Sequence, residues 1–304
     1  MIRKAFVGIA LGACLAALQL AATTLSAQEL KVLSERTATG FGHPESVAYD
    51  PKGKVLYVGD FGPDLKPADK DGKGKINKVS LDGKIIEEGF LPAKGQVLNK
   101  PKGIWIKGNR MWVADIDAVW QFDLKTKNGK KLELPGVVYA NDVTVVGDML
   151  YVSDNRSDQV VRVAPADFLN SKKPPKITVV FKGKSVFPNG LYPSKNGTLL
   201  MVGFESKDKP QGIYQLALGH DEPTLVSDKI GMLDGLYRTS NGNILATDWI
   251  SGSLFQWNAK MKMKRLATGF KGPADFCVVP NAKGLLVIVP DLVKGELRFV
   301  QLGK

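Results

Sequence analysis

The tetrapeptide Pro188-Asn189-Gly190-Leu191 leads from a turn into an apolar segment, and five similar tetrapeptides occur in this chain. The other five are Pro44-Glu45-Ser46-Val47, Pro101-Lys102-Gly103-Ile104, Ala140-Asn141-Asp142-Val143, Leu233-Asp234-Gly235-Leu236 and Pro273-Ala274-Asp275-Phe276. Their second positions lie 39 to 57 residues apart along the chain. Recurrence at about this spacing is typical of repeat architectures, in which each repeat is one supersecondary unit.

The fifth repeat shows the strand pattern of a repeat most clearly. Apolar segments at 236–239 and 244–247 flank Ser240-Asn241-Gly242-Asn243. Asn-Gly between two apolar segments is a strong signal for a β-hairpin. A third strand is predicted over 254–257 and a fourth over 264–267. Each repeat is therefore predicted to form about four short antiparallel strands.

An aspartate follows the second predicted strand in most repeats. It occurs at Asp60, Asp115, Asp154, Asp248 and Asp291, and Phe204 takes its place in the fourth repeat. An aspartate at the start of a turn accepts hydrogen bonds from nearby backbone amides. We therefore predict that these aspartates cap turns and have no catalytic role.

Six such repeats predict an all-β protein, a six-bladed β-propeller, because radial closure leaves few sheet edges exposed. The sixth repeat contains only three strands before the chain ends. Residues 30–38 precede the first tetrapeptide, and they are predicted to supply the missing fourth strand of the last blade. The propeller is expected to occupy residues 28–304 as a single domain.

Residues 1–27 have the composition of a cleaved signal peptide. Arg3 and Lys4 precede an apolar segment at 5–20, and Leu25-Ser26-Ala27 forms a small-residue cleavage site. This pattern predicts a periplasmic or secreted protein without a stable membrane span. A lipoprotein anchored through Cys14 is the less favoured alternative, because the cysteine lies early within the apolar segment.

The composition limits the partners of the protein. The formal net charge is +12, and the lysines are spread in small groups over predicted turns. This surface fits either anionic partners or a solubilising coat. No nucleic-acid motif is present, and all five tryptophans are predicted to pack between blades. Beyond the signal peptide only Cys277 remains, and it is predicted to be a buried, inert thiol.

The innermost strand of each blade lines the central channel of a propeller, so the second tetrapeptide positions should form a ring. The ring consists of Glu45, Lys102, Asn141, Asn189, Asp234 and Ala274. Its carboxylate and carboxamide oxygens suit Ca²⁺ and can accept Mg²⁺ or Mn²⁺, and the lack of sulfur and imidazole ligands disfavours Zn²⁺. Asn-Gly and Asp-Gly also form turns on their own. The shared position in separate repeats favours the metal site.

These motifs resemble the senescence-marker-protein/gluconolactonase/regucalcin family, and more distantly the paraoxonases and strictosidine synthases. The resemblance rests on Glu45, Asn141-Asp142, Asn189-Gly190 and Asp234-Gly235 in separate repeats. It implies a six-bladed propeller that holds one divalent cation through Glu45, Asn189 and Asp234. It also implies that Asn141 contacts substrate or water and that Asp234 acts as general base. The implied activity is hydrolysis of lactones or related esters, supported by Ca²⁺ or Zn²⁺.

The chain also departs from this family. Gluconolactonase-like members carry an arginine two residues before the matching asparagine, whereas this chain has Tyr139. Lys102 places an ammonium group in the ring, where it would repel a cation or bind an anionic substrate. His43 lies two residues before Glu45 and is a further candidate base, with an ordinary loop histidine as the alternative.

Two functions therefore fit the sequence. The first is an exported, divalent-metal-dependent hydrolase of the lactonase or esterase type that acts on a small molecule in the channel. The oxygen donors of the ring favour it. The second is a non-catalytic, NHL-like periplasmic propeller that uses the same ring to bind a small ligand or a protein partner. Lys102 and Tyr139 favour the second, and the fold alone does not decide between them.

Overall fold

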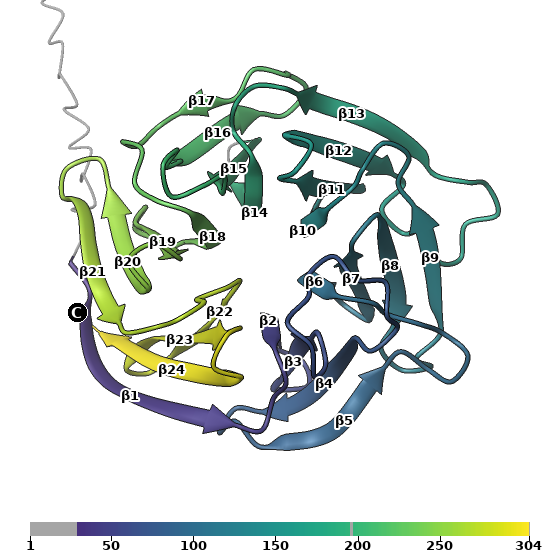
Figure 1. Ribbon diagram of the computed structural model, residues 1–304, viewed down its shortest axis with the longest axis horizontal. Helices are drawn as coiled ribbons and strands as arrows, with labels where there is room; N and C mark the ends of the chain where they lie inside the picture. Colours follow the sequence, from purple (N-terminus) through teal and green to yellow (C-terminus); the bar gives the residue numbers. More distant parts are fainter. Residues whose placement is uncertain (1–28, 195–196, 304) are drawn as a thin grey trace, which may run out of the picture.

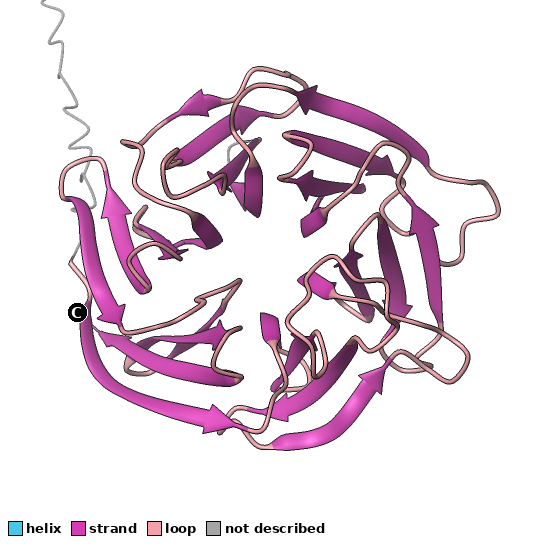
Figure 2. Cartoon of the chain, viewed as in Figure 1, coloured by secondary structure: helices cyan, strands magenta, loops and turns pink. Residues whose placement is uncertain are grey.

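The computed structural model describes residues 29–194 and 197–303, which form a ring of six antiparallel sheets with four strands each (Figure 1). No helix occurs in this described part of the chain (Figure 2). The predicted all-β, six-bladed propeller is confirmed. The predicted signal peptide at 1–27 and its Cys14 lie outside the described residues.

Each blade consists of four strands that follow one another from the channel to the outer rim. Blade 1 contains β2 (Pro44–Asp50), β3 (Val55–Asp60), β4 (Lys75–Ser80) and β5 (Ile85–Leu91). Blade 2 contains β6 (Pro101–Lys107), β7 (Arg110–Asp115), β8 (Ala118–Asp123) and β9 (Gly129–Glu133). Blade 3 contains β10 (Ala140–Val146), β11 (Met149–Asp154), β12 (Gln159–Ala164) and β13 (Lys176–Lys182).

The remaining three blades repeat this order. Blade 4 contains β14 (Pro188–Ser194), β15 (Thr198–Gly203), β16 (Ile213–Ala217) and the short β17 (Thr224–Leu225). Blade 5 contains β18 (Leu233–Arg238), β19 (Ile244–Asp248), β20 (Ser253–Asn258) and β21 (Lys262–Thr268). Blade 6 contains β22 (Cys277–Asn281), β23 (Gly284–Asp291), β24 (Glu296–Gly303) and, as its outer strand, β1 (Lys31–Thr39).

The ring is closed by pairing between the two ends of the described chain. Strand β1 runs antiparallel to β24, from Lys31 opposite Gly303 to Thr39 opposite Glu296, with one irregularity in register. This pairing confirms that the segment before the first tetrapeptide completes the last blade. The chain runs from β1, the outer strand of the last blade, into β2, the inner strand of the first, so this pairing holds the first and last blades together.

The aspartates at the ends of the second strands cap backbone amides, as predicted. Asp60 accepts from the amides of Gly42, His43 and Gly62, and Asp291 accepts from those of Lys271, Gly272 and Lys294. Asp115, Asp154 and Asp248 make equivalent bonds. These bonds fix the loop that enters each blade and thereby place the tetrapeptide that follows.

The first strands carry a break in regular pairing where the tetrapeptides predict the ring. The register of β10 with β11 shifts between Ala140 and Val143, and that of β14 with β15 shifts between Pro188 and Leu191. Blades 1, 2 and 5 show the same irregularity. A bulge of this kind interrupts the regular alternation of side chains between the two faces of a strand. It explains why neighbouring residues of one strand can face different ends of the channel.

Hydrophobic cores lie between neighbouring blades. One cluster joins Trp112 and Val119 of blade 2 to Leu150 of blade 3, and another joins Val58 of blade 1 to Phe299 of blade 6. Trp112, Trp120 and Trp257 pack in such clusters, as predicted. Trp249 differs from the predicted packing between blades, because it follows the end of β19 and lines the channel pocket described below.

Cys277 also differs from its prediction. It lies at the start of β22 and is partly exposed, so a fully buried thiol is not observed. Desolvation, followed by the charge of Asp275, raises the pKa of the thiol well above its usual value. The sulfur therefore stays protonated near neutral pH and is a weak nucleophile, which agrees with the predicted lack of reactivity.

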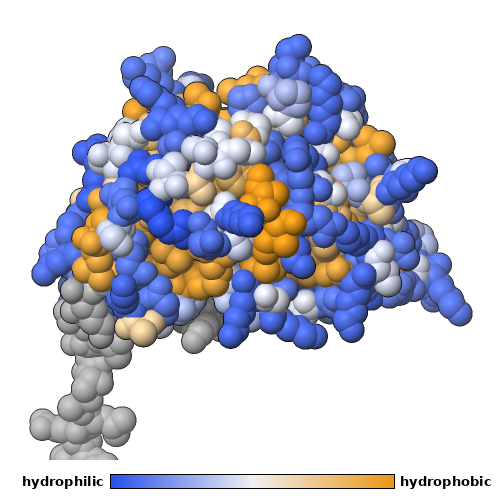
Figure 3. Space-filling view, turned by 90° about the horizontal axis from the view of Figure 1, so that it is seen from below, coloured by the Kyte–Doolittle hydropathy of each residue, from blue (hydrophilic) through white to orange (hydrophobic). Residues whose placement is uncertain are grey.

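The outer face is mainly hydrophilic, with hydrophobic side chains between the charged ones (Figure 3). Exposed hydrophobic residues on the outer strands include Leu33 of β1, Ile86 of β5 and Val179 of β13. Within the part of the chain that is described, no helix is long and apolar enough to span a membrane.

Candidate functional site

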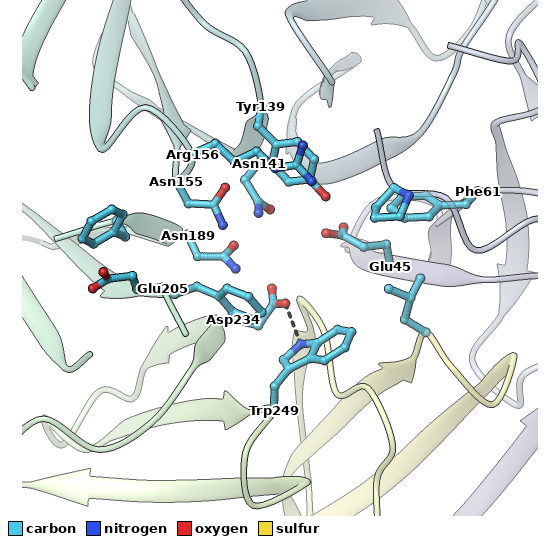
Figure 4. Close-up of a pocket in the computed structure, with 14 residues that line it drawn as sticks. Glu45, Phe61, Tyr139, Asn141, Asn155, Arg156, Asn189, Glu205, Asp234 and Trp249 are labelled. Carbon is cyan, nitrogen blue, oxygen red and sulfur yellow. Dashed lines mark hydrogen bonds between the residues drawn. The ribbon is translucent and has the colours of Figure 1, made fainter. Parts of the chain in front are cut away.

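One end of the channel opens into a pocket of about 520 Å³. We call it the donor pocket. It is lined by Glu45, Phe61, Pro67, Tyr139, Asn141, Asn155, Arg156, Phe187, Asn189, Phe204, Glu205, Asp234, Trp249 and Leu292. Figure 4 shows that these side chains converge from several blades on a common centre. Its volume is within the usual range for a small-molecule site.

The floor of the donor pocket is formed by four of the six predicted ring residues. Glu45, Asn141, Asn189 and Asp234 all line it, and each is at least nine-tenths buried. The structure therefore brings together the four residues predicted as metal ligands. Lys102 and Ala274 are fully buried at the matching positions but do not line the pocket.

Hydroxyl groups of the second strands hold this ring in place. The Ser153 hydroxyl donates to the carbonyl oxygen of Asn189 (2.7 Å) and accepts from the amide of Asp142 (2.9 Å). Thr247 makes the corresponding bonds, since its hydroxyl donates to the carbonyl of Ala274 and accepts from the amide of Gly235. Each hydroxyl links two adjacent blades, so the spacing of the ring is set by backbone contacts.

Four buried oxygen atoms in the donor pocket have no hydrogen-bond partner. They are Oε2 of Glu45, Oδ1 of Asn155, Oδ1 of Asn189 and Oδ1 of Asp234. The other buried side-chain atoms without a partner in the described residues belong to groups outside this pocket. A buried acceptor without a partner costs about 1–3 kcal/mol. The pocket therefore concentrates acceptors that a bound cation or a donor group would satisfy.

This donor set fits a hard cation. Two carboxylates and two carboxamides present oxygen atoms only, which is the chemistry that Ca²⁺ prefers and that Mg²⁺ or Mn²⁺ can accept. Among the described residues, no group of three or more His, Cys, Asp or Glu side chains is arranged to hold a metal. A cation in this pocket would thus depend on the asparagine oxygens as well as on Glu45 and Asp234.

The acidic groups of the pocket have raised pKa values. Burial, and then the charge of Asp234, raises the pKa of Glu45 well above its usual value, while the charge of Lys102 opposes this shift. Burial raises the pKa of Asp234 to about 7, opposed by the hydrogen bond from Trp249. Two buried carboxylates that share a site repel one another, and a divalent cation would remove that repulsion.

Trp249 fixes the orientation of Asp234. Its indole Nε1–H donates to Oδ2 of Asp234 at 2.9 Å, and this bond leaves Oδ1 without a partner (Figure 4). The ring of Trp249 also meets that of Phe204 edge to face, with centroids 5.8 Å apart. One carboxylate oxygen is thus held by the protein while the other remains available to a ligand.

A second set of lining residues was missed by the sequence analysis. They follow directly after the last residue of the second strand in five blades, and they are Phe61, Asn155, Phe204, Trp249 and Leu292. Their position in the repeat is the feature of the sequence that could have predicted them, because four of them directly follow a capping aspartate. The rim that they form is apolar except for Asn155.

Tyr139 and Arg156 line one side of the pocket. Tyr139 occupies the sequence position at which gluconolactonase-like proteins carry an arginine. The guanidinium carbon of Arg156 lies 3.9 Å from the centre of the Tyr139 ring, and Lys102 Nζ lies 4.3 Å from the same centre. Arg156 lines the pocket, whereas Lys102 lies behind Tyr139, outside the lining. A different loop therefore supplies an arginine to this pocket.

Lys102 is a buried ammonium with few partners. Its Nζ donates to the carbonyl oxygen of Lys100 (3.3 Å) and lies 5.3 Å from the centre of the Phe61 ring. Burial lowers the pKa of Lys102 to about 8, although the charge of Glu45 acts in the opposite direction. Near neutral pH it therefore remains mostly charged and lies close enough to influence Glu45.

His43 and Glu205 occupy less direct positions. His43 Nδ1 lies 2.8 Å from the carbonyl oxygen of Leu292, and since a carbonyl only accepts, Nδ1 carries the proton. His43 does not line the pocket. Glu205 does line it, but its oxygens are engaged by Gln211 (2.7 Å) and Lys209 (3.0 Å). Glu205 is thus a carboxylate of the pocket without an unpaired oxygen.

No protein-family model matches this sequence, and no curated protein matches it either. The fold is similar to that of virginiamycin B lyase from Staphylococcus aureus, which is 13% identical over 90% of this chain and 99% of that chain, with a TM-score of 0.60. A catalytically inactive His-to-Ala variant of that lyase with quinupristin is 15% identical over 90% of this chain and 99% of that one, with a TM-score of 0.59. A streptogramin B lyase structure is 14% identical, covers 89% and 98%, and has a TM-score of 0.57. At these identities the likeness establishes the six-bladed propeller fold.

Proposed function

We propose that this protein is a divalent-cation-dependent hydrolase that cleaves lactones or related esters in the donor pocket. The observation that carries the proposal is the group of four unpaired buried oxygens on Glu45, Asn155, Asn189 and Asp234. Their all-oxygen chemistry favours Ca²⁺, with Mg²⁺ and Mn²⁺ as alternatives, over Zn²⁺. The resemblance of the ring motifs to the gluconolactonase-like family supports the same chemistry.

A bound divalent cation supplies a Lewis acid that polarises an ester carbonyl and stabilises negative charge on its oxygen. The residues around it perform the other tasks. Asp234, fixed through Oδ2 by Trp249, would hold the cation through Oδ1, and its carboxylate is also placed to accept the proton of an attacking water. The amides of Asn141 and Asn155 can orient the substrate by hydrogen bonds. The rim of Phe61, Phe204 and Leu292 restricts the access of bulk water.

The charges around the pocket favour a substrate with an anionic group. Arg156 lines the pocket and is held against Tyr139, so it can bind a carboxylate with little loss of side-chain freedom. Lys102, behind the same tyrosine, adds positive charge. We therefore propose an anionic lactone or ester as the substrate class, with Arg156 taking the place of the family arginine that is missing at Tyr139.

The reaction of the structural neighbours is not the one we propose. The quinupristin-bound lyase is catalytically inactive once a histidine is replaced by alanine. In this chain, none of the residues that line the donor pocket is a histidine. Carboxylate chemistry therefore fits the pocket better than a histidine-dependent reaction.

We also propose that the protein is exported to the periplasm or secreted, on the basis of the signal-like residues 1–27. Expression of the full chain in a bacterium, followed by fractionation and sequencing of the new N-terminus, tests this proposal. Cleavage after Ala27 is expected, and retention of Met1 in a cytoplasmic product would contradict it.

The catalytic proposal is tested with the chain from residue 28 onward. Titration calorimetry with Ca²⁺, Mg²⁺, Mn²⁺ and Zn²⁺ should show one cation per chain. A panel of anionic and neutral lactones and aryl esters, with and without chelator, should show cation-dependent hydrolysis that is faster for the anionic members. Asp234→Asn should lower cation affinity about 100-fold or more, because a buried cation would lose a charged ligand.

Glu205→Gln is the matched control, since Glu205 lines the same pocket with its oxygens already engaged. It should change cation affinity by no more than a few fold. Failure of the wild-type chain to bind any of the four cations would refute the metal site. Cation binding with chelator-insensitive background rates across the panel would assign the pocket to ligand binding without catalysis.

A further inference from the structure

The other end of the channel holds a second cavity, of about 410 Å³. We call it the aromatic pocket. Its walls come from the same six innermost strands, at positions that follow the ring residues, and include Tyr49, Trp105, Tyr192, Tyr237 and Phe276. Asn141 lines the donor pocket and the next residue, Asp142, lines the aromatic pocket. The tetrapeptides thus separate two cavities on one axis.

Two carboxylates lie at the inner end of the aromatic pocket. Asp142 of blade 3 and Asp275, which precedes β22 of blade 6, occupy the same third tetrapeptide position. Blades 3 and 6 face one another across the ring (Figure 1). The third position is glycine in three of the other blades and serine in the fourth. These small residues leave the centre of the channel to the two aspartates.

The two carboxylates have no basic counterpart in the pocket. No lysine, arginine or histidine is among the described residues that line it, and none of the described ion pairs includes Asp142 or Asp275. Asp142 accepts from the backbone amides of Val143 and Leu191, both at 2.6 Å. Backbone amides hold this side chain in place, and among the described residues no cationic side chain pairs with it.

The walls are aromatic and accessible from outside. Tyr49, Trp105, Tyr192 and Tyr237 are each partly exposed, and the rings of Tyr192 and Tyr237 meet edge to face with centroids 5.3 Å apart. Aromatic faces attract cations as well as apolar groups. The cavity therefore has apolar walls and an acidic end.

We propose that the aromatic pocket is a second binding site, specific for an organic amine with an apolar body. The ammonium group would lie between Asp142 and Asp275, and the apolar part would pack on the tyrosine and tryptophan rings. An organic amine fits better than a metal ion, because both oxygens of Asp142 already accept backbone hydrogen bonds. The site is independent of the function proposed for the donor pocket.

The experiment compares three probes of one shape on the chain from residue 28 onward. Calorimetry near neutral pH measures 2-phenylethylamine, the neutral 2-phenylethanol and the anionic 3-phenylpropanoate. We expect one amine per chain, bound at least about tenfold more tightly than the alcohol, because an ionic hydrogen bond contributes about 1.5–3 kcal/mol. The carboxylate should not bind. Equal affinity of wild-type protein for amine and alcohol, or no binding of the amine, overturns the proposal.

Variants then locate the site. Asp275→Asn keeps the shape of the side chain and should abolish the preference for amine over alcohol. Asp234→Asn in the donor pocket should keep it. Retention of the preference in Asp275→Asn contradicts the proposal, and so does displacement of the amine from Asp234→Asn protein by millimolar Ca²⁺, which would assign the aspartates to a metal.

A second readout uses the wild-type protein, so it does not depend on whether a variant folds. Cys277 lines the aromatic pocket and is partly exposed, so iodoacetamide should alkylate it slowly at alkaline pH. Saturating 2-phenylethylamine should slow this alkylation several-fold, and 2-phenylethanol at the same concentration should slow it much less. Equal protection by both probes, or no protection, would count against the proposal.

Discussion

The donor pocket and the aromatic pocket share the inner strands of blades 1, 3, 4 and 5, but they differ in how their acids are satisfied. Asp234 in the donor pocket has one oxygen bonded to Trp249 and one without a partner. Asp142 in the aromatic pocket has both oxygens bonded to backbone amides. Both are buried aspartates of a tetrapeptide. The unpaired oxygen, more than burial or residue type, distinguishes a candidate metal ligand from an acid held by the backbone.

The strongest test of this difference removes both acidic groups of the ring from the donor pocket. In Glu45→Gln with Asp234→Asn, the pocket keeps its shape and its asparagines but loses the two carboxylates that have unpaired oxygens. Cation affinity should fall about 1,000-fold or more, since each lost ionic contact of a buried ion costs several kcal/mol. Calorimetry measures this loss.

The same double variant should bind 2-phenylethylamine as the wild type does, because the aromatic pocket keeps both of its aspartates. Loss of amine binding along with cation binding would show that the two cavities are not separate sites. Unchanged cation affinity would remove Glu45 and Asp234 from the metal site.

The next prediction concerns the boundary between the pockets. A Cβ atom on Gly103 would lie 2.1 Å from Oδ1 of Asp142 and 2.6 Å from its Cα. Gly103→Ala should therefore move Asp142 and destabilise the protein by about 1–3 kcal/mol, as overpacking of a tight core does. Urea unfolding measures the change in stability.

A Gly→Ala change at an open position such as Gly136 would not serve as a control, because the positive φ of Gly136 (81°) would strain the alanine backbone. Ser46→Ala is more suitable, since it removes the hydroxyl that donates to the carbonyl of Lys102 without adding atoms. It should cost about 1 kcal/mol. A Gly103→Ala protein as stable as the wild type would contradict the tight contact.

The ring could be predicted from the sequence because its members share one position in repeated strands. Turn residues and apolar strands placed Glu45, Asn141, Asn189 and Asp234 at matching positions, and closure of the propeller brings such positions together. The fold followed from the same pattern, down to the N-terminal strand that completes the last blade.

Other parts of the site could not be predicted in the same way. Arg156 lies two residues beyond β11, and only the conformation of its loop brings it onto Tyr139. Trp249 shares with the other four tryptophans the prediction that it packs between blades. The capping bonds of Asp248 end the preceding strand, and this tertiary feature turns Trp249 toward Asp234.

A further effect is expected on the pH dependence of stability without a cation. Burial raises the pKa of Asp234 from its ordinary value of 3.8 to about 7 in the folded protein, so the folded state holds the proton more tightly. Stability attributable to this group is present at low pH and is lost as pH rises from about 4 through 7. Asp234→Asn should therefore be more stable than wild type at pH 8, by up to about 4 kcal/mol, and about equally stable at pH 4.

Urea unfolding in chelator at several pH values checks this prediction, with Glu205→Gln as the control that should follow the wild type. Addition of Ca²⁺ at pH 8 should raise the free energy of unfolding of the wild-type protein but hardly change that of Asp234→Asn, because only the wild type binds the cation tightly. A constant difference between wild type and Asp234→Asn at all pH values would show that Asp234 does not titrate in this range.

The smallest effect concerns Lys102, the ring member that opposes a cation. Its ammonium is buried behind Tyr139 and its charge acts on Glu45. In Lys102→Met the apolar stem is kept and the positive charge is removed, so cation affinity should rise about five- to tenfold, equivalent to about 1 kcal/mol.

Lys107→Met on the same strand is the control, because Lys107 is exposed and its replacement should leave the affinity unchanged. Weaker cation binding in Lys102→Met would mean that the ammonium positions Glu45 as a ligand, and the repulsion inferred for the ring would be wrong.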